Sequence, residues 1–213
     1  MKRTLYFLAM LALAGQLSAA IISTNFTSGF LNGGVIPDGN LSGWADTRTL
    51  SGYNGLTVEN LEVTLNISGG WNGDLYGYLV HDSGFVVLLD RVGKTANPGE
   101  TFGFSNSGFD GVTLSDNDAY SLIQTTGSHA STPALASGYY NTGSGTLDTA
   151  FTGLDVNGSW SLFFADMSAG DISQVTSWTL TINAVPEPTT WAMILFAATF
   201  AGWRFVAWRK KMV

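Results

Sequence analysis

The sequence contains no cysteine, which excludes a disulfide framework, a thiolate metal site and a cysteine nucleophile. Basic residues are also scarce, because of nine lysines and arginines only Arg48, Arg91 and Lys94 lie within residues 21–184. The same interval holds all of the sixteen acidic residues except Glu187. An acidic domain repels phosphate backbones, so we expect no nucleic-acid partner and favour divalent cations or neutral polymers instead.

Histidine is nearly absent too, which bears on catalysis. The two histidines, His81 and His129, lie in polar segments typical of turns, and we interpret them as surface loop residues rather than general bases. A serine protease needs a serine, a histidine and an acid in hydrogen-bond geometry, but the sequence has no subtilisin nucleophile or histidine motif. A catalytic subtilisin domain would also not fit the length. We therefore predict that the chain is not an enzyme.

The N-terminus has the three parts of a secretory signal peptide. Lys2 and Arg3 precede an apolar run over residues 5–14, and the small residues at 18–20 offer a cleavage site before Ile21. The apolar run is well short of the roughly 20 residues that a membrane span needs, which favours a cleaved peptide over an uncleaved anchor. We predict that residues 1–20 are a signal peptide and that the chain is exported.

The C-terminus combines a Pro-Glu-Pro tripeptide, an apolar stretch and a basic end. Residues 191–203 carry no charge, and the chain closes with a Trp-Arg-Lys-Lys run at 208–211. If Arg204 snorkels, the helix extends to Trp208 and reaches roughly 27 Å at about 1.5 Å per residue, close to the hydrocarbon thickness of a bilayer. We predict one transmembrane helix here, with the basic end in the cytoplasm and the domain outside the inner membrane.

This C-terminal segment, residues 185–213, resembles the PEP-CTERM sorting signal of Gram-negative bacteria. In that family the tripeptide, here Pro186, Glu187 and Pro188, is the recognition element for an exosortase, a membrane enzyme that removes the tail. The resemblance implies display on the cell surface or release, and an association with extracellular polysaccharide or biofilm. The alternative is that the tripeptide is a simple linker before an anchor.

Between the two ends the sequence has the pattern of short strands and turns. Leu61, Val63, Leu65 and Ile67 alternate with polar residues, which is the period-two signature of a half-buried strand. Glycine, asparagine and aspartate turns separate further strands, which we expect at residues 75–80, 85–89, 159–165 and 177–182.

These strands predict the architecture of the domain. Many short strands without an amphipathic helix favour an all-β fold, an antiparallel β-sandwich of jelly-roll type at residues 56–184, with a barrel as the second choice. We expect residues 21–55 to pack on the sandwich as an N-terminal segment. Residues 124–149 are rich in small residues and weakly patterned, so we interpret them as a loop with uncertain strands.

A second resemblance rests on the strand at 61–67 and on four short motifs: Gly73-Asp74-Leu75, Gly158-Ser159-Trp160, Gly170-Asp171 and Trp178-Thr179-Leu180. With these elements the domain resembles the P domain (P/Homo B domain) that follows the catalytic domain of kexin-like and other subtilisin-type proteases. The resemblance implies a jelly-roll sandwich that stabilises or assists a partner domain and has no catalytic residues of its own. Trp71 and Asn72 stand where that family commonly has a histidine, and Ser173 where it has a glycine.

Calcium is the cofactor that the loops favour. Carboxylates and loop carbonyls are the oxygen ligands of a hard cation, although no EF-hand spacing is present. The candidate ligands are Asp74, Asp166 and Asp171, which match positions of the P-domain motif, and Asp116 in a separate loop. The alternative is that these aspartates make Asx turns and hydrogen bonds within their loops.

Aromatic residues beside glycines are candidates for carbohydrate binding. Trp71 and Tyr139 could stack on pyranose faces, as could Trp44. Trp160 and Trp178 lie in strand patterns, so we expect them in the core. The alternative for the first group is that the rings close the ends of the sandwich.

Three functions are compatible with these features. The first is a non-enzymatic exported surface or matrix module, sorted by an exosortase. The second is an accessory domain that docks on a subtilisin-like protease or derives from one. The third is a lectin-like carbohydrate-binding adhesin.

Overall fold

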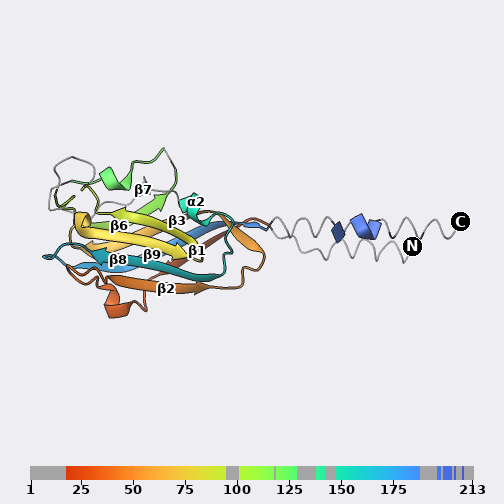
Figure 1. Cartoon of the computed structure of the whole chain (residues 1–213), viewed down its shortest axis with the longest axis horizontal. Coiled ribbons are helices and arrows are strands. Elements are labelled where there is room, and N and C mark those ends of the chain that lie inside the picture. Colours follow the sequence, from red (N-terminus) through yellow and green to blue (C-terminus); the bar gives the residue numbers. More distant parts are fainter. Residues whose placement is uncertain are drawn as a thin grey trace.

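The computed structural model describes residues 18–94, 101–117, 119–128, 138–142 and 147–187, and in the C-terminal segment residues 196–197, 199–202, 204 and 208. Within these residues the domain is a sandwich of one five-stranded and one four-stranded sheet (Figure 1). The all-β sandwich predicted from the sequence is therefore confirmed, and the expected strands are all found.

The strands of each sheet come from distant parts of the chain. The larger sheet has the order β1 (Ala20–Phe26), β9 (Ser173–Pro186), β3 (Leu56–Gly69), β6 (Gly108–Ser115) and β7 (Gly138–Asn141). The smaller sheet has the order β2 (Trp44–Leu50), β8 (Gly158–Asp166), β4 (Leu75–His81) and β5 (Gly84–Asp90). The short helical segments are η1 (Leu31–Gly34), η2 (Asn72–Asp74), η3 (Ile123–Thr125) and α2 (Leu147–Phe151).

One strand pair departs from the predicted antiparallel arrangement. β7 runs parallel to β6, with Val112 opposite Gly138, whereas the other pairs among the described strands are antiparallel. A parallel pair needs a long connection that returns the chain to the same end of the sheet, and residues 116–137 supply it. The segment 124–149, which the sequence predicts as a loop with uncertain strands, contains β7 and the start of α2.

The core lies between the inward faces of the two sheets. The alternating apolar residues of β3 are buried as predicted, and so are Trp160 of β8 and Trp178 of β9. Of the two interpretations of Trp44, the structure supports the one in which the ring closes the sandwich, because the side chain is 1% exposed. Its Nε1 donates to the Leu31 carbonyl at 2.9 Å, and its ring stacks on Phe164, so it closes the core rather than offering a face to a ligand.

A buried carboxylate ties the two sheets together. Trp178 Nε1, from the larger sheet, donates a 2.7 Å hydrogen bond to Oδ2 of Asp46 in β2. Arg48 Nε donates to the same oxygen at 2.8 Å, and its guanidinium lies 5.0 Å from the centre of the Phe26 ring. The inward polar residues of β2 are thus satisfied within the fold.

The first strand of the domain begins, and the last strand ends, at the same end of the larger sheet. Ala20 pairs with Ala184 and Leu56 pairs with Pro186 at one end of the larger sheet. At the other end Gly69 pairs with Ser173. We call the first the terminal end and the second the distal end of the sandwich. Residues 21–55 supply an edge strand to each sheet, β1 and β2.

The segments expected to contact the membrane fall mostly outside the described residues. Residues 1–17 are not described, and β1 begins at Ala20, next to the predicted signal-peptide cleavage site. Within the parts of the chain that are described, no helix is long and apolar enough to cross a membrane.

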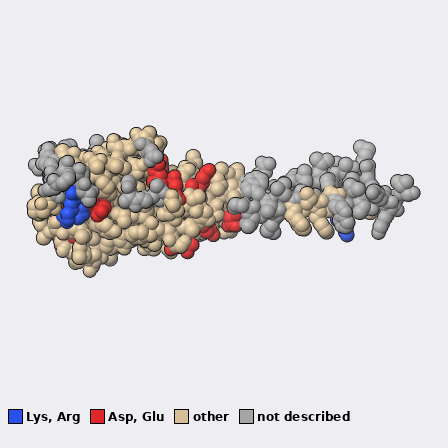
Figure 2. All heavy atoms as spheres, turned by 45° about the horizontal axis from the view of Figure 1, so that its top comes forward, with Lys and Arg blue, Asp and Glu red and all other residues tan. Residues whose placement is uncertain are grey.

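Charged side chains are unevenly spread over the face shown in Figure 2. Most of the acidic side chains visible on the sandwich gather over the half nearer the C-terminal segment, and the basic ones lie at the opposite, distal end.

Candidate functional site

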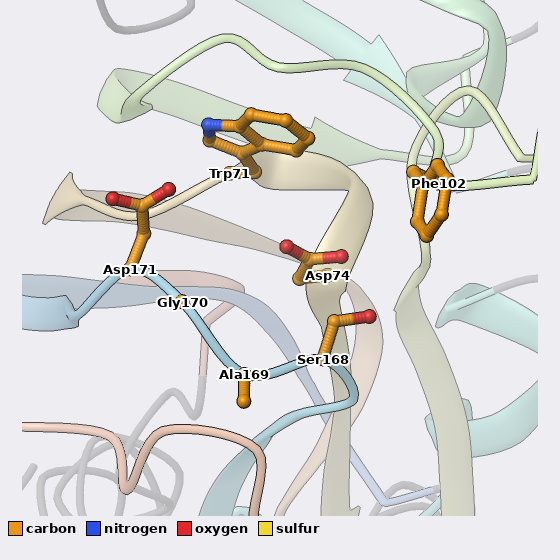
Figure 3. A pocket seen from close by; sticks show the side chains of 7 residues that line it. All are labelled: Trp71, Asp74, Phe102, Ser168, Ala169, Gly170 and Asp171. Carbon is orange, nitrogen blue, oxygen red and sulfur yellow. The ribbon is translucent and has the colours of Figure 1, made fainter.

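Three loops enclose a cavity of about 330 Å³ at the distal end, which we call the distal pocket. The loops are the β3–β4 turn, the segment that precedes β6, and the β8–β9 loop. The pocket is lined by Trp71, Asp74, Phe102, Ser168, Ala169, Gly170 and Asp171 (Figure 3).

The β3–β4 turn reaches the pocket because glycines let it approach its neighbours closely. Gly70 has a φ of +60°, and a Cβ there would lie 1.9 Å from Ser173 Oγ. A Cβ on Gly73 would lie 2.3 Å from the carbonyl oxygen of Phe102. Any side chain at these two positions would push the three loops apart and open the pocket.

A buried amide fixes the turn to β6. Asn72 is 1% exposed; its Nδ2 donates to the Gly108 carbonyl at 2.9 Å, and its Oδ1 accepts from the Gly108 N–H at 2.8 Å. The Gly73 N–H donates to the Phe104 carbonyl at 2.8 Å. With its neighbour held in this way, Trp71 projects from a rigid backbone.

Arg91, directly after β5, is bonded to two of the loops that line the pocket, the β3–β4 turn and the β8–β9 loop. Its φ is +53°, an unfavourable value for a residue with a side chain. From this conformation Nε donates to the Gly73 carbonyl at 3.0 Å, and Nη2 donates to Ser168 Oγ at 3.1 Å and lies 3.5 Å from Asp74 Oδ1. These contacts compensate the backbone strain and hold the acceptors of the pocket in place.

The two carboxylates that line the pocket differ in their surroundings. Burial raises the pKa of Asp74 above its ordinary value, and the Ser168 hydroxyl and the Arg91 guanidinium counteract part of that rise. Asp171 lies in the β8–β9 loop beside the Trp71 ring (Figure 3). The adjacent Gly170 N–H donates to the Asp38 carboxylate at 3.0 Å, which anchors this loop.

Two aromatic rings border the opening. Trp71 is 38% exposed and Phe102 is 59% exposed. In Figure 3 the two rings stand apart on either side of the Asp74 carboxylate. The pocket therefore combines apolar ring faces with oxygen acceptors, which is the composition of a small-molecule site rather than of a core defect.

The pocket brings together three of the predicted site residues, Trp71, Asp74 and Asp171. Asp166 lies behind it, 1% exposed, and accepts from the Ser168 N–H at 3.0 Å. Burial also raises the pKa of Asp166. Tyr139 is in β7, and its side chain lies outside the described part of the structure.

Asp116 lies in a different cavity, of about 260 Å³, near α2. Its Oδ2 accepts from the Asp148 N–H at 2.7 Å. Burial and the neighbouring Asp148 raise the pKa of Glu62, and burial and Asp116 raise the pKa of Asp148. Among the described residues no group of three or more histidine, cysteine, aspartate or glutamate side chains is placed to hold a metal ion, so calcium stays a prediction.

His81 contradicts the interpretation as a surface residue. It ends β4, is 2% exposed, and stacks on Trp160 with the ring centres 3.8 Å apart. Its Nδ1 lies 3.1 Å from the Ser159 carbonyl oxygen and its Nε2 lies 2.6 Å from that of Asp155. Neither ring nitrogen is left to take a proton from a substrate. His129 is outside the described residues.

Sequence reasoning missed Phe102, Ser168 and Arg91. Nothing in the sequence around Phe102 or Ser168 marks them as parts of a site. Arg91 did offer a signal, because a rare cation in an acidic domain must have carboxylate or carbonyl partners close by when it is partly buried.

The predicted sorting tripeptide begins inside the fold. Pro186 is the last residue of β9 and pairs with Leu56. The Glu187 N–H donates to the Gly55 carbonyl at 3.0 Å. Pro188 is outside the described residues. The first two residues of the tripeptide are thus held against the sandwich.

Comparison with known proteins supports the predicted sorting signal at the C-terminus. The PEP-CTERM protein-sorting motif matches residues 184–211. No curated protein matches the chain. A solved structure described as the crystal structure of serine protease of Aeromonas sobria is similar with a TM-score of 0.43 and 15% identity, over 81% of this chain and 28% of that one. The chain therefore carries, at the end of its β-sandwich, the PEP-CTERM signal of exported proteins that an exosortase-type enzyme processes.

Proposed function

We propose that the chain is a non-enzymatic surface or matrix module that is exported, sorted by an exosortase-type enzyme and associated with extracellular polysaccharide or biofilm. The observation that carries the proposal is the continuity of β9, a single strand that runs from the distal pocket to Pro186 of the sorting motif. The first three residues of the motif, Ala184 to Pro186, are therefore part of the sandwich itself.

The geometry of β9 supports a display role. Its 14 residues, at about 3.3 Å each, separate the two ends of the sandwich by about 45 Å. The sorting signal leaves from the terminal end, and the pocket opens at the distal end. A chain held by its signal therefore presents the pocket away from the point of attachment.

The surroundings of His81 support the absence of catalysis. A general base needs a free nitrogen within reach of a substrate. His81 is buried with both nitrogens against carbonyl oxygens, so it serves the fold.

The test is mass spectrometry of the exported protein in wild type and in Glu187→Ala. The wild-type protein should lack the signal peptide and the tail that follows the tripeptide, and the variant should retain the tail. Glu59→Ala is the matched control, because Glu59 is an exposed glutamate of β3 outside the motif, and it should be processed as wild type. An intact tail in the wild-type protein, or normal processing of Glu187→Ala, would contradict the proposal.

A second candidate function is an accessory role related to the P domain. It is favoured by one observation: the two Gly-Asp pairs of the P-domain-like motif, Gly73-Asp74 and Gly170-Asp171, meet at the same pocket. The test is to mix the exported protein with a subtilisin-like catalytic domain that lacks its own P domain. A raised melting temperature of the enzyme would favour this function. An unchanged melting temperature would count against it and favour the surface or matrix module.

A further inference from the structure

We propose that the distal pocket is a binding site for a pyranose saccharide without acidic groups, in which Trp71 is the stacking platform and Asp74, Asp171 and Ser168 accept the hydroxyl hydrogens. The proposal deepens the proposed function and rests on it for the source of the ligand, an extracellular polysaccharide. The chemistry of recognition rests on the pocket alone.

The first step is the exposure of Trp71. The other described tryptophans of the sandwich, Trp44, Trp160 and Trp178, are each at most 1% exposed, whereas Trp71 presents ring surface to solvent at the mouth of a cavity. The weakly polar C–H face of a pyranose covers such a ring well, and the apolar area removed from water supplies the free energy.

The second step is the set of acceptors beside the ring. A pyranose carries several hydroxyl donors at fixed spacing, and carboxylate oxygens accept such hydrogens strongly. The Asp74 carboxylate lies in the middle of the pocket and Asp171 lies beside Trp71 (Figure 3). A saccharide could stack on the ring and donate to both carboxylates from one position.

The third step is preorganisation. Arg91 fixes Gly73, Asp74 and Ser168, and Asn72 fixes the turn that carries Trp71. Little conformational entropy therefore remains to be lost when a ligand enters. The volume of about 330 Å³ is at the lower end of the ~300–1,000 Å³ of small-molecule sites. A rigid pocket of this size can still bind specifically.

The fourth step is selectivity by charge. Among the described residues, those that line the pocket include two carboxylates and no lysine or arginine. The nearest guanidinium, that of Arg91, is already bonded to Asp74, Ser168 and the Gly73 carbonyl. A uronate carboxylate would therefore be placed beside two carboxylates, which disfavours it relative to a neutral sugar.

The experiment is isothermal titration of the full chain, purified in a detergent without a sugar headgroup. The probes are neutral oligosaccharides of glucose, galactose, mannose and N-acetylglucosamine, and an oligogalacturonate of equal length. At least one neutral oligomer should bind, and oligogalacturonate should bind at least about tenfold more weakly, a difference of about 1.4 kcal/mol. Trp71→Ala should weaken neutral binding about tenfold or more, and Asp171→Asn should narrow the gap between the neutral and acidic oligomers.

The matched control is Phe85→Ala, which removes another exposed aromatic, 53% exposed on β5, outside the pocket. This variant should bind as wild type. The proposal is overturned if no neutral oligomer binds, if oligogalacturonate binds as tightly, or if Phe85→Ala weakens binding as much as Trp71→Ala. Because the titration does not depend on processing, failure here with normal tail removal would refute the saccharide site alone, and failure of tail removal with normal binding would refute the sorting proposal alone.

Discussion

Access of a processing enzyme to the sorting tripeptide should be limited by the end of the β-sandwich. Pro186 pairs with Leu56, and the Glu187 N–H donates to the Gly55 carbonyl. An enzyme that binds the tripeptide in extended form must first release these residues from β3. We therefore predict that an insertion of Gly-Ser-Gly-Ser between Val185 and Pro186 accelerates removal of the tail.

The magnitude follows from the contacts that the insertion removes. Each backbone hydrogen bond contributes about 0.5–1.5 kcal/mol net. Loss of the Glu187–Gly55 bond thus lowers the opening free energy by about 0.5–1.5 kcal/mol, and the open fraction rises about 2- to 13-fold. If opening and closing are faster than processing, the processing rate rises by the same factor.

The assay is a pulse-chase measurement of tail removal in the cell. The control is the same insertion between the exposed residues Asn40 and Leu41, which leaves β9 intact and should not change the rate. An unchanged or slower rate for the insertion at Val185 would refute the idea that the fold protects the tripeptide.

Three further predictions concern stability. Asp46→Ala should destabilise the domain by about 3 kcal/mol in urea unfolding, because it leaves Trp178 and Arg48 without their shared buried acceptor, whereas Asp110→Ala on the exposed side of β6 should change little. The raised pKa of Asp148 means that the folded state binds more protons than the unfolded state. The contribution of Asp148 to stability therefore falls as pH rises through the interval between its ordinary and its raised pKa. In urea titrations at both pH values, Asp148→Asn should be more stable than wild type at pH 7 and equal to it well below pH 4. If the distal loops bind calcium, millimolar calcium should raise the melting temperature of wild type but not of Asp171→Asn; an equal effect on both would place any calcium elsewhere.

The sequence predicts the strands whose inward residues are uniformly apolar. β3 follows this rule, because Leu61, Val63 and Leu65 all face the core. β2 does not follow it, because two of its four inward positions are polar. These positions are Trp44, Asp46, Arg48 and Leu50. The two polar members are bonded to each other, and Asp46 also accepts from Trp178, 132 residues away in sequence. A partner at that distance leaves no trace in the local pattern.

The pocket could be predicted only in part for a related reason. Trp71, Asp74 and Asp171 were each candidates, but for two separate ligands and on two separate loops. Their meeting depends on topology: β3 pairs with β9 and β4 pairs with β8, so the turn that connects β3 to β4 lies beside the loop that connects β8 to β9. Phe102 joins them through the segment before β6, which nothing in the sequence assigns to this end.

The distribution of charge fits a sandwich that stands away from its point of attachment. The visible acidic side chains gather over the half nearer the sorting signal (Figure 2). An anionic membrane surface repels such a half over roughly a Debye length, about 8–10 Å. β9 runs without a break from the distal end to Pro186, so this repulsion acts on the sandwich as one rigid body and holds its terminal end away from the surface.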